Sequence, residues 1–197
     1  MKNNAYKTVL LIFTGIILGI FLTSTCIDVY RKAVKKHEAQ VKEKAIDNAS
    51  KNGYNAEFIE KKKFFIEDNE VKYYFLIDAS GVCFDECEFE VQEDGVKVKD
   101  GALLISIRHK DNNNISVRCD DTRIILLDDG TEKAMYSGMF FISNTDFDKE
   151  SFVINSFVPD AEQKALEAYN TIMKYTSADK LKKEYNQALA ICKLLNA

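Results

Sequence analysis

The feature that most constrains this chain is an uncharged run near its start, Thr8 to Ile27, which lies between Lys7 and Asp28. A helix rises about 1.5 Å per residue, so this run would extend about 30 Å, the thickness of the hydrocarbon core of a bilayer. No second run of this kind occurs in the 197 residues. The sequence therefore predicts a transmembrane anchor over residues 1–27 that crosses the membrane once.

Two other interpretations of the N-terminus stay open. A cleaved secretory signal has a shorter apolar core and a pattern of small residues before the cut, which is absent here. A lipoprotein signal would place a leucine three residues before Cys26 and Gly, Ala or Ser directly before it. Thr23 and Thr25 occupy those positions, and Leu22 lies one position too early. We favour the uncleaved anchor, with a cleaved secreted form and a lipoprotein as the alternatives.

Gly15, Gly19 and Thr23 lie four residues apart on one face of the predicted membrane helix. Small residues at this spacing allow two membrane helices to approach closely, which favours packing as a homodimer. Glycine is also common in single spans. A monomeric span is therefore the other interpretation, and the more common case.

The formal net charge of −4 hides an uneven distribution. The basic residues Arg31, Lys32, Lys35 and Lys36 follow the predicted anchor, whereas the chain beyond residue 44 carries a net charge of −9. An acidic globular part repels phosphate backbones, so we exclude nucleic acid as a partner. The four cations instead predict contact with anionic lipid headgroups, worth roughly 1 kcal/mol each, with a solvated helix face as the alternative.

The positive-inside rule gives two answers for this chain. Lys2 and Lys7 favour a cytoplasmic N-terminus, whereas the basic cluster at 31–36 favours the opposite orientation. We favour the first, which places the domain outside the cytoplasm, because the apolar run begins close to the first residue. The cysteine content also suits an oxidising compartment. A domain on the cytosolic side is the alternative.

Residues 28–53 have the composition of a helix, rich in Ala, Lys, Glu and Gln, and Gly53 can end it in the left-handed conformation. Val34, Val41 and Asn48 recur every seven residues after Ile27 and form a thin seam. A seam this narrow predicts a basic helical stalk that continues the membrane helix, or one side of a weak coiled coil, rather than a core helix.

From residue 54 to 158 the apolar pattern takes the period of strands. Short segments rich in Phe, Tyr, Ile and Val alternate with turn dipeptides such as Asp94-Gly95 and Asp100-Gly101. Many short strands joined by such turns predict an antiparallel, β-sandwich-like domain. The predicted strands are 63–67, 71–78, 88–92, 102–109, 115–118, 122–127, 132–136, 139–143 and 152–158.

Residues 159–197 begin at the only proline and contain two apolar stripes at helical spacing. The first stripe is Ala165, Leu166, Tyr169, Ile172 and Met173, and the second is Leu181, Tyr185, Ala188, Leu189, Cys192 and Leu195. They predict a helical hairpin that buries its apolar face on an open side or end of the sheet. The predicted fold class is therefore mainly β with helical additions, α+β.

The stretch from Val96 to Val158 resembles the immunoglobulin-like domains of membrane-anchored bacterial envelope proteins. The segments that carry the resemblance are ALLISIRH, the polar tip KDNNN, ISVRC, and the strand and turn TRIILLDDGTEKAMY. The resemblance covers about a third of the chain and includes no catalytic or ligand residue. It implies a role in binding or assembly.

Four cysteines lie outside the predicted anchor: Cys83, Cys87, Cys119 and Cys192. An even number in an exported domain predicts disulfides, and four cysteines allow three pairings. Inert thiols are the alternative. A structural zinc site prefers two close cysteine pairs, and only Cys83 and Cys87 are close, so we expect no metal.

Catalytic motifs are absent from the sequence. His37 and His109 are the only histidines, neither belongs to a nucleophile or zinc motif, and there is no glycine-rich phosphate loop. We therefore expect no cofactor and no catalytic residue. The sequence favours a single-pass, membrane-anchored, non-catalytic binding or assembly module of a cell envelope, with a protein partner. The alternatives are a cytosol-facing membrane scaffold whose basic stalk contacts lipid, and an exported hydrolase or carbohydrate-binding protein.

Overall fold

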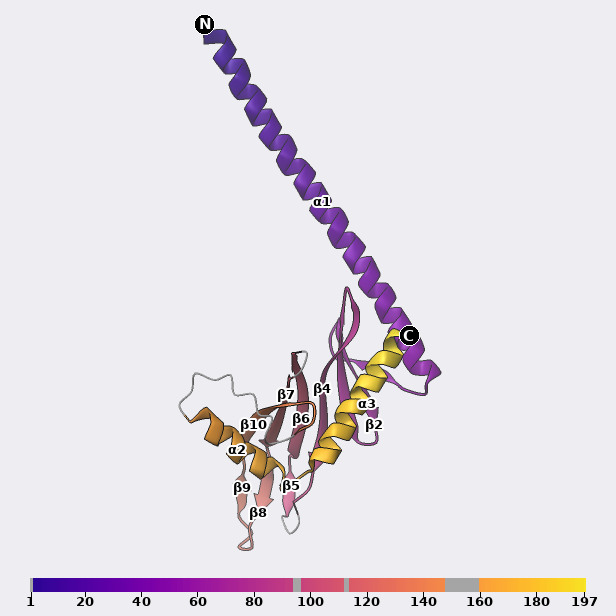
Figure 1. Cartoon of the computed structure of the whole chain (residues 1–197), viewed down its shortest axis with the longest axis vertical. Coiled ribbons are helices and arrows are strands. Elements are labelled where there is room, and N and C mark those ends of the chain that lie inside the picture. The colour runs from indigo at the N-terminus through magenta and orange to yellow at the C-terminus, as the bar shows by residue number, and fades with distance from the viewer. Residues whose placement is uncertain (1, 94–96, 112–113, 148–159) are drawn as a thin grey trace.

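The computed structural model describes the backbone of residues 2–93, 97–111, 114–147 and 160–197, and their side chains from Cys26 onward, Asp111 excepted. The described part of the chain contains helices and short antiparallel strands (Figure 1). In chain order these are α1 (Lys2–Lys51), β1 (Ala56–Phe58), β2 (Lys63–Asp68), β3 (Val71–Asp78), β4 (Gly81–Val91), β5 (Val98–Asp100), β6 (Leu103–Asp111), β7 (Asn114–Asp121), β8 (Ile124–Leu126), β9 (Glu132–Ala134), β10 (Ser137–Asn144), α2 (Ala161–Ile172) and α3 (Ala178–Asn196).

The strands form two antiparallel sheets. The larger sheet has seven strands in the order β1-β2-β3-β4-β6-β7-β10, and the smaller has the order β5-β8-β9. Four of the six neighbouring pairs in the larger sheet join strands that are consecutive in the chain, because short turns join antiparallel strands most simply. This architecture confirms the predicted α+β class with antiparallel sheets. The predicted strand at 152–158 lies outside the described residues.

Alternation of side chains decides which face of the larger sheet is buried. In β3, Val71, Tyr73, Phe75 and Ile77 are buried, whereas the residues between them are exposed or half-buried. The turn from β2 into β3 uses Asn69 and Glu70, both at positive φ, as a tight hairpin with the twist of its strands requires. The predicted strand boundaries 71–78 are thereby confirmed.

The buried face of the larger sheet is covered by helices (Figure 1). Helix α3 contacts β4 and β3, helix α2 contacts β10, and the end of α1 contacts α3, β3 and β4. The two C-terminal helices are consecutive in the chain, as predicted, but each packs on different strands of the sheet. Their stripes also differ from those predicted, because Leu166 and Leu189 are exposed while Glu184 and Ile191 are buried.

Helix α1 is continuous from Lys2 to Lys51, and Figure 1 shows most of it projecting beyond the sheets. Its last turns are part of the core, since Ala45 and Ala49 are both 0% exposed. The prediction that this helix stays outside the core is therefore wrong for its C-terminal end. Alanine has a very short side chain, so α1 and α3 can approach each other closely there, and a thin seam is sufficient to bury the contact.

No helix in the described part of the chain is both long and apolar enough to span a bilayer. The uncharged run from Thr8 to Ile27 lies almost wholly in residues 1–25, whose side chains are outside the described set. The same holds for Gly15, Gly19 and Thr23. The transmembrane anchor and its packing face therefore stay predictions.

A buried ion pair joins the two sheets where β7 leads into β8. Arg123 is 4% exposed, and its guanidinium donates to both carboxylate oxygens of Asp121, at 2.9 and 2.7 Å. Glu93, two residues after the end of β4, accepts from the same guanidinium at 3.4 Å. The hydrogen bonds from Arg123, together with its positive charge, hold the pKa of Asp121 below its usual value. The chain is thus fixed at the point where it leaves the larger sheet.

Candidate functional site

The most specific arrangement of polar groups lies where the end of α3 meets β4. The side-chain amide of Asn196 accepts from the backbone N–H of Val82 at 2.9 Å and donates to the Val82 carbonyl at 2.8 Å. Among the described strands, only β3 pairs with this end of β4, since β6 pairs from Glu86 onward. Asn196 therefore takes the place of a neighbouring strand and satisfies the exposed backbone edge.

Helix α1 contributes the other side of this junction. Lys44 Nζ donates to the Asn196 carbonyl and Asn48 Nδ2 donates to the Leu195 carbonyl, each at 3.3 Å. These carbonyls belong to the last turn of α3, where no backbone N–H of the same helix is available to donate to them. A cation near that end also complements the helix dipole. Side chains of α1 thus cap α3 and join the projecting helix to the domain.

Two further contacts extend the junction along α1. Glu38 pairs with Lys62 at 2.6 Å, and Lys42 Nζ lies 3.7 Å from the centre of the Phe58 ring. The second contact is a cation–π interaction on the short edge strand β1. The helix is therefore held by the domain over about three turns, from Glu38 to Ala49, rather than at a single hinge.

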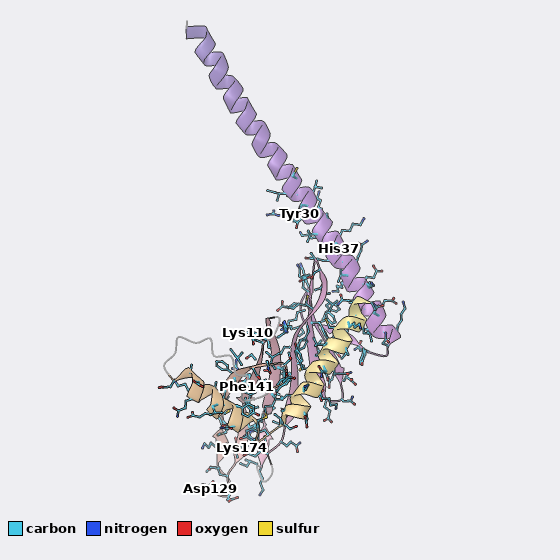
Figure 2. All side chains as sticks on the ribbon, in the orientation of Figure 1. Tyr30, His37, Lys110, Asp129, Phe141 and Lys174 are labelled. Atoms are coloured by element: carbon cyan, nitrogen blue, oxygen red, sulfur yellow. The ribbon has the colours of Figure 1, made fainter. Side chains whose placement is uncertain are left out.

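The part of α1 between residue 26 and this junction is exposed. Figure 2 shows Tyr30 on the helix beyond the domain and His37 near the upper end of the sheet. Val29 and Tyr30 are 63% and 70% exposed. The predicted headgroup-contacting residues Arg31, Lys32, Lys35 and Lys36 are all exposed too, and none takes part in a salt bridge between described residues.

The cysteines do not form the predicted disulfides, because all five are free. Cys83 and Cys87 both lie on β4, rather than on a loop that could bring their thiols together. Tyr74 pairs with Glu86 and Phe75 with Phe84, so the residue between them bulges out and reverses the alternation of faces. Cys83 is consequently exposed and Cys87 is buried on the opposite face.

The other predicted pairings fail for geometric reasons. Cys87 lies on β4 and Cys119 on β7, and β6 runs between these strands. Two strand spacings amount to about 9.6 Å, which exceeds the reach of a disulfide. Cys192 lies on α3, where its Sγ donates to the Val82 carbonyl at 3.2 Å. Burial raises the pKa of Cys119 to about 11 and also raises that of Cys87, so both thiols stay protonated and unreactive at neutral pH.

A buried polar pair links α3 to the larger sheet, and the sequence reasoning did not find it. Tyr73 donates its hydroxyl proton to Glu184 Oε2 at 2.6 Å, and both residues are buried. Burial, together with the hydrogen bond to Glu184, raises the pKa of Tyr73. Lys183 lies 3.5 Å from the other carboxylate oxygen. The only signal was that Glu184 follows Leu181 by three residues and so shares its face of the helix.

This pair borders a groove of about 590 Å³ between the β2–β3 turn and the start of α3. Its polar groups are largely satisfied by one another, since Gln187 Nε2 donates to Asp68 Oδ2 at 3.3 Å. A tyrosine that retains its proton and donates it to a carboxylate serves as a structural hydrogen bond rather than as a general base. The hydrogen bonds that line the groove therefore join α3 to the β2–β3 hairpin.

The face of the larger sheet opposite the helices is rich in charged residues. Arg108 donates to Glu86 at 2.7 Å, and Tyr74 donates to Glu88 at 3.0 Å. Next to these residues is a shallow groove of about 630 Å³, where four glutamates outnumber one lysine: Glu67, Glu70, Glu88, Glu90 and Lys72. No set of three or more His, Cys, Asp or Glu side chains with metal-binding geometry occurs in the described part of the chain. The described part of this face is therefore an acidic surface.

Comparison of the chain with protein-family models, with curated proteins and with solved structures found no match.

Proposed function

We propose that this protein is a non-catalytic binding or assembly module that is anchored in a membrane by residues 1–27. One observation carries the proposal: α1 runs without a break from the predicted anchor into the core of the domain, where Ala45 and Ala49 are fully buried. From Ile27 to Ala45 the helix rises about 27 Å. The domain would therefore stand at a set distance from the bilayer instead of moving on a flexible linker.

The exposed residues of α1 support this placement. Tyr30 follows the uncharged run closely, and aromatic residues of this kind are enriched where a membrane helix leaves the bilayer. Arg31 and Lys32 come next, with their charges free to contact anionic headgroups. A domain held near one membrane gains effective concentration for partners in the same membrane. The resemblance of residues 96–158 to immunoglobulin-like envelope domains agrees with a binding role and stays a prediction.

Fractionation of cells tests the anchor. We expect the full chain to sediment with membranes and to require detergent for release, not high salt or carbonate. A variant that begins at Asp28 should be soluble and folded, because the core begins beyond it. Replacing Lys35 and Lys36 by Gln in the full chain should leave sedimentation unchanged, since the apolar run supplies most of the binding. Release of the full chain by carbonate would refute the proposal.

A second candidate function, a scaffold that faces the cytosol, is favoured by the free thiols. Disulfides are rare in the cytosol, and basic residues that follow a membrane helix favour the cytoplasmic side. Cys83 is a natural reporter because it is exposed, whereas Cys87 and Cys119 are buried. The exported hydrolase or carbohydrate-binding protein stays as the third interpretation, with no residue of the described chain that favours it.

Labelling of intact cells distinguishes the two sides of the membrane. In a Cys26→Ser background, a membrane-impermeant maleimide should label Cys83 before lysis if the domain lies outside the cytoplasm. Labelling only after permeabilisation would establish the scaffold orientation. A Cys26→Ser, Cys83→Ser variant serves as the control, since its remaining cysteines are buried or half-buried and should react slowly in both conditions.

A further inference from the structure

The groove between the β2–β3 turn and the start of α3 is lined by a carboxylate that is almost fully buried. Glu184 is 6% exposed, whereas glutamates are rarely buried to this degree unless they are paired. The volume of the groove, about 590 Å³, lies in the range of small-molecule sites. Such sites place a few polar groups on a concave wall, and here the polar groups include Glu184, Tyr73 and Gln187.

The two carboxylate oxygens of Glu184 have different surroundings. Oε2 accepts the hydroxyl proton of Tyr73 at 2.6 Å. Oε1 lies 3.5 Å from Lys183 Nζ, which is longer than the roughly 2.7–3.2 Å of an N–H···O hydrogen bond, and it accepts no hydrogen bond from another described residue. A carboxylate that has lost most of its water needs donors at both oxygens. Oε1 is therefore the oxygen whose requirement is unmet.

Lys183 shows which kind of group fits beside Oε1, but it does not hold that position firmly. Its side chain is 78% exposed, and an ion pair with a largely exposed partner contributes little to stability. The other lysine that lines the groove, Lys180, directs its Nζ to the Phe89 ring, 4.7 Å from the ring centre. A primary ammonium thus has room next to Oε1, and the ammonium of this chain that lies there is readily displaced into water.

The geometry of Glu184 limits the class of ligand. A guanidinium pairs best with both oxygens of a carboxylate, and Tyr73 already occupies Oε2. A metal ion needs several ligands, and the described residues contain no set of three or more His, Cys, Asp or Glu with metal-binding geometry. A primary ammonium is a compact donor that can bind to a single oxygen.

We propose that this groove binds a small molecule with a primary ammonium group, which donates a hydrogen bond to Glu184 Oε1 and displaces Lys183. This site goes beyond the proposed function, because it requires neither the anchor nor a protein partner. The hydrogen bond from Tyr73 to Oε2 remains in place when the ligand binds, so the ligand adds to the link between α3 and β3 instead of breaking it.

The test is a chemical-shift titration of the full chain in detergent micelles, with methyl-labelled valine. Val71 lines the groove and reports on binding there. We expect n-propylammonium to shift the Val71 methyl signals and to saturate with a dissociation constant of about 1 mM. N-propylacetamide is neutral and should not bind. n-Propyltrimethylammonium keeps the charge but has no N–H donor, so it should bind about tenfold more weakly.

Matched variants locate the site. Glu184→Gln removes the charge but keeps an oxygen for the Tyr73 hydroxyl, and it should weaken n-propylammonium binding by about tenfold or more. Lys183→Gln removes the competing ammonium and should tighten binding by about two- to fivefold. Lys182→Gln is the control and should leave affinity unchanged. It removes the same charge one residue away, where Lys182 pairs with Asp146 at 2.9 Å and does not line the groove.

The absence of a saturable shift at Val71 would overturn the proposal, and so would equal binding of the neutral amide or of the trimethylated cation. Unchanged affinity in Glu184→Gln would place the ligand elsewhere. Equal effects of Lys183→Gln and Lys182→Gln would show a response to net charge rather than to Oε1. Thermal unfolding checks that Glu184→Gln is folded. If it is not, the two lysine variants decide, since both side chains are exposed. Binding in micelles does not require the anchor to be correct, so this test and the fractionation test fail independently.

Discussion

Replacing Asn196 by Ala should destabilise the domain by about 2 kcal/mol. The substitution removes two hydrogen bonds to the Val82 backbone, at 2.9 and 2.8 Å, and a third to the Cys192 carbonyl. Each hydrogen bond contributes roughly 0.5–1.5 kcal/mol net, and the two to Val82 lie at a half-buried strand edge where water replaces them in part. The helical Cys192 carbonyl keeps its backbone partner, so we assign little to the third bond.

The assay is urea and thermal unfolding of the wild type and the variant, monitored by circular dichroism. A loss of about 2 kcal/mol would lower the midpoint of thermal unfolding by roughly 4–8 °C for a domain of this size. Hydrogen exchange gives a local readout, because the Val82 N–H loses its acceptor and should exchange roughly tenfold faster or more. Asn52→Ala is the matched control, since its exposed amide bonds only to the Asn48 carbonyl. It should cost under about 0.5 kcal/mol.

A variant whose stability lies within about 0.5 kcal/mol of the wild type, with unchanged exchange at Val82, would refute this reasoning. It would mean that the edge of β4 does not need Asn196. The link between α1, α3 and the sheet would then depend on apolar contacts such as those of Ala45 and Ala49.

Three further predictions concern polar groups that are buried or half-buried, and all are measured by urea unfolding. Tyr73→Phe should lower the free energy of unfolding by about 2 kcal/mol, because it removes the hydrogen bond to the buried carboxylate of Glu184. A coupling energy near zero between Tyr73→Phe and Glu184→Gln in a double-mutant cycle would contradict the pairing. Arg123→Met should cost about 3 kcal/mol by leaving Asp121 buried without its partner, and adding Asp121→Asn should restore part of the loss. Burial and the neighbouring Glu88 raise the pKa of Tyr74 to about 12, above its ordinary value of about 10, so this tyrosine stabilises the fold below pH 10 and loses that effect as the pH rises from about 10 to 12. Tyr74→Phe should therefore show a shallower alkaline loss of stability than the wild type.

The sequence alone was sufficient for elements whose pattern is local. Alternation in VKYYFLID predicted β3 with its boundaries, and the turn at Asn69 was evident from its polar residues. Both C-terminal helices were also evident from their stripes, although the buried face was rotated relative to the prediction. Periods of two and near 3.6 residues follow from the backbone itself, so they can be recognised without knowing what the element contacts.

Several features could not be recognised in this way because they depend on residues far apart in the chain. The disulfide prediction rested on the even number of cysteines, and only the bulge in β4 shows that the thiols of Cys83 and Cys87 point to opposite faces. The burial of Glu184 requires Tyr73, which lies 111 residues earlier. No sequence period reveals such a partner, since a carboxylate on a helix is exposed in most proteins.

What the sequence by itself determined is the list of elements: an uncharged run long enough to cross a bilayer, a basic helix after it, short antiparallel strands and two amphipathic helices. What only the tertiary structure decided is how they are joined. The last turns of α1 enter the core, Asn196 completes the edge of β4, and helix α2 packs on β10. The physical reason is that propensity and period act over a few neighbouring residues, whereas burial, capping and strand pairing are satisfied by whichever distant segment the packed fold brings into contact.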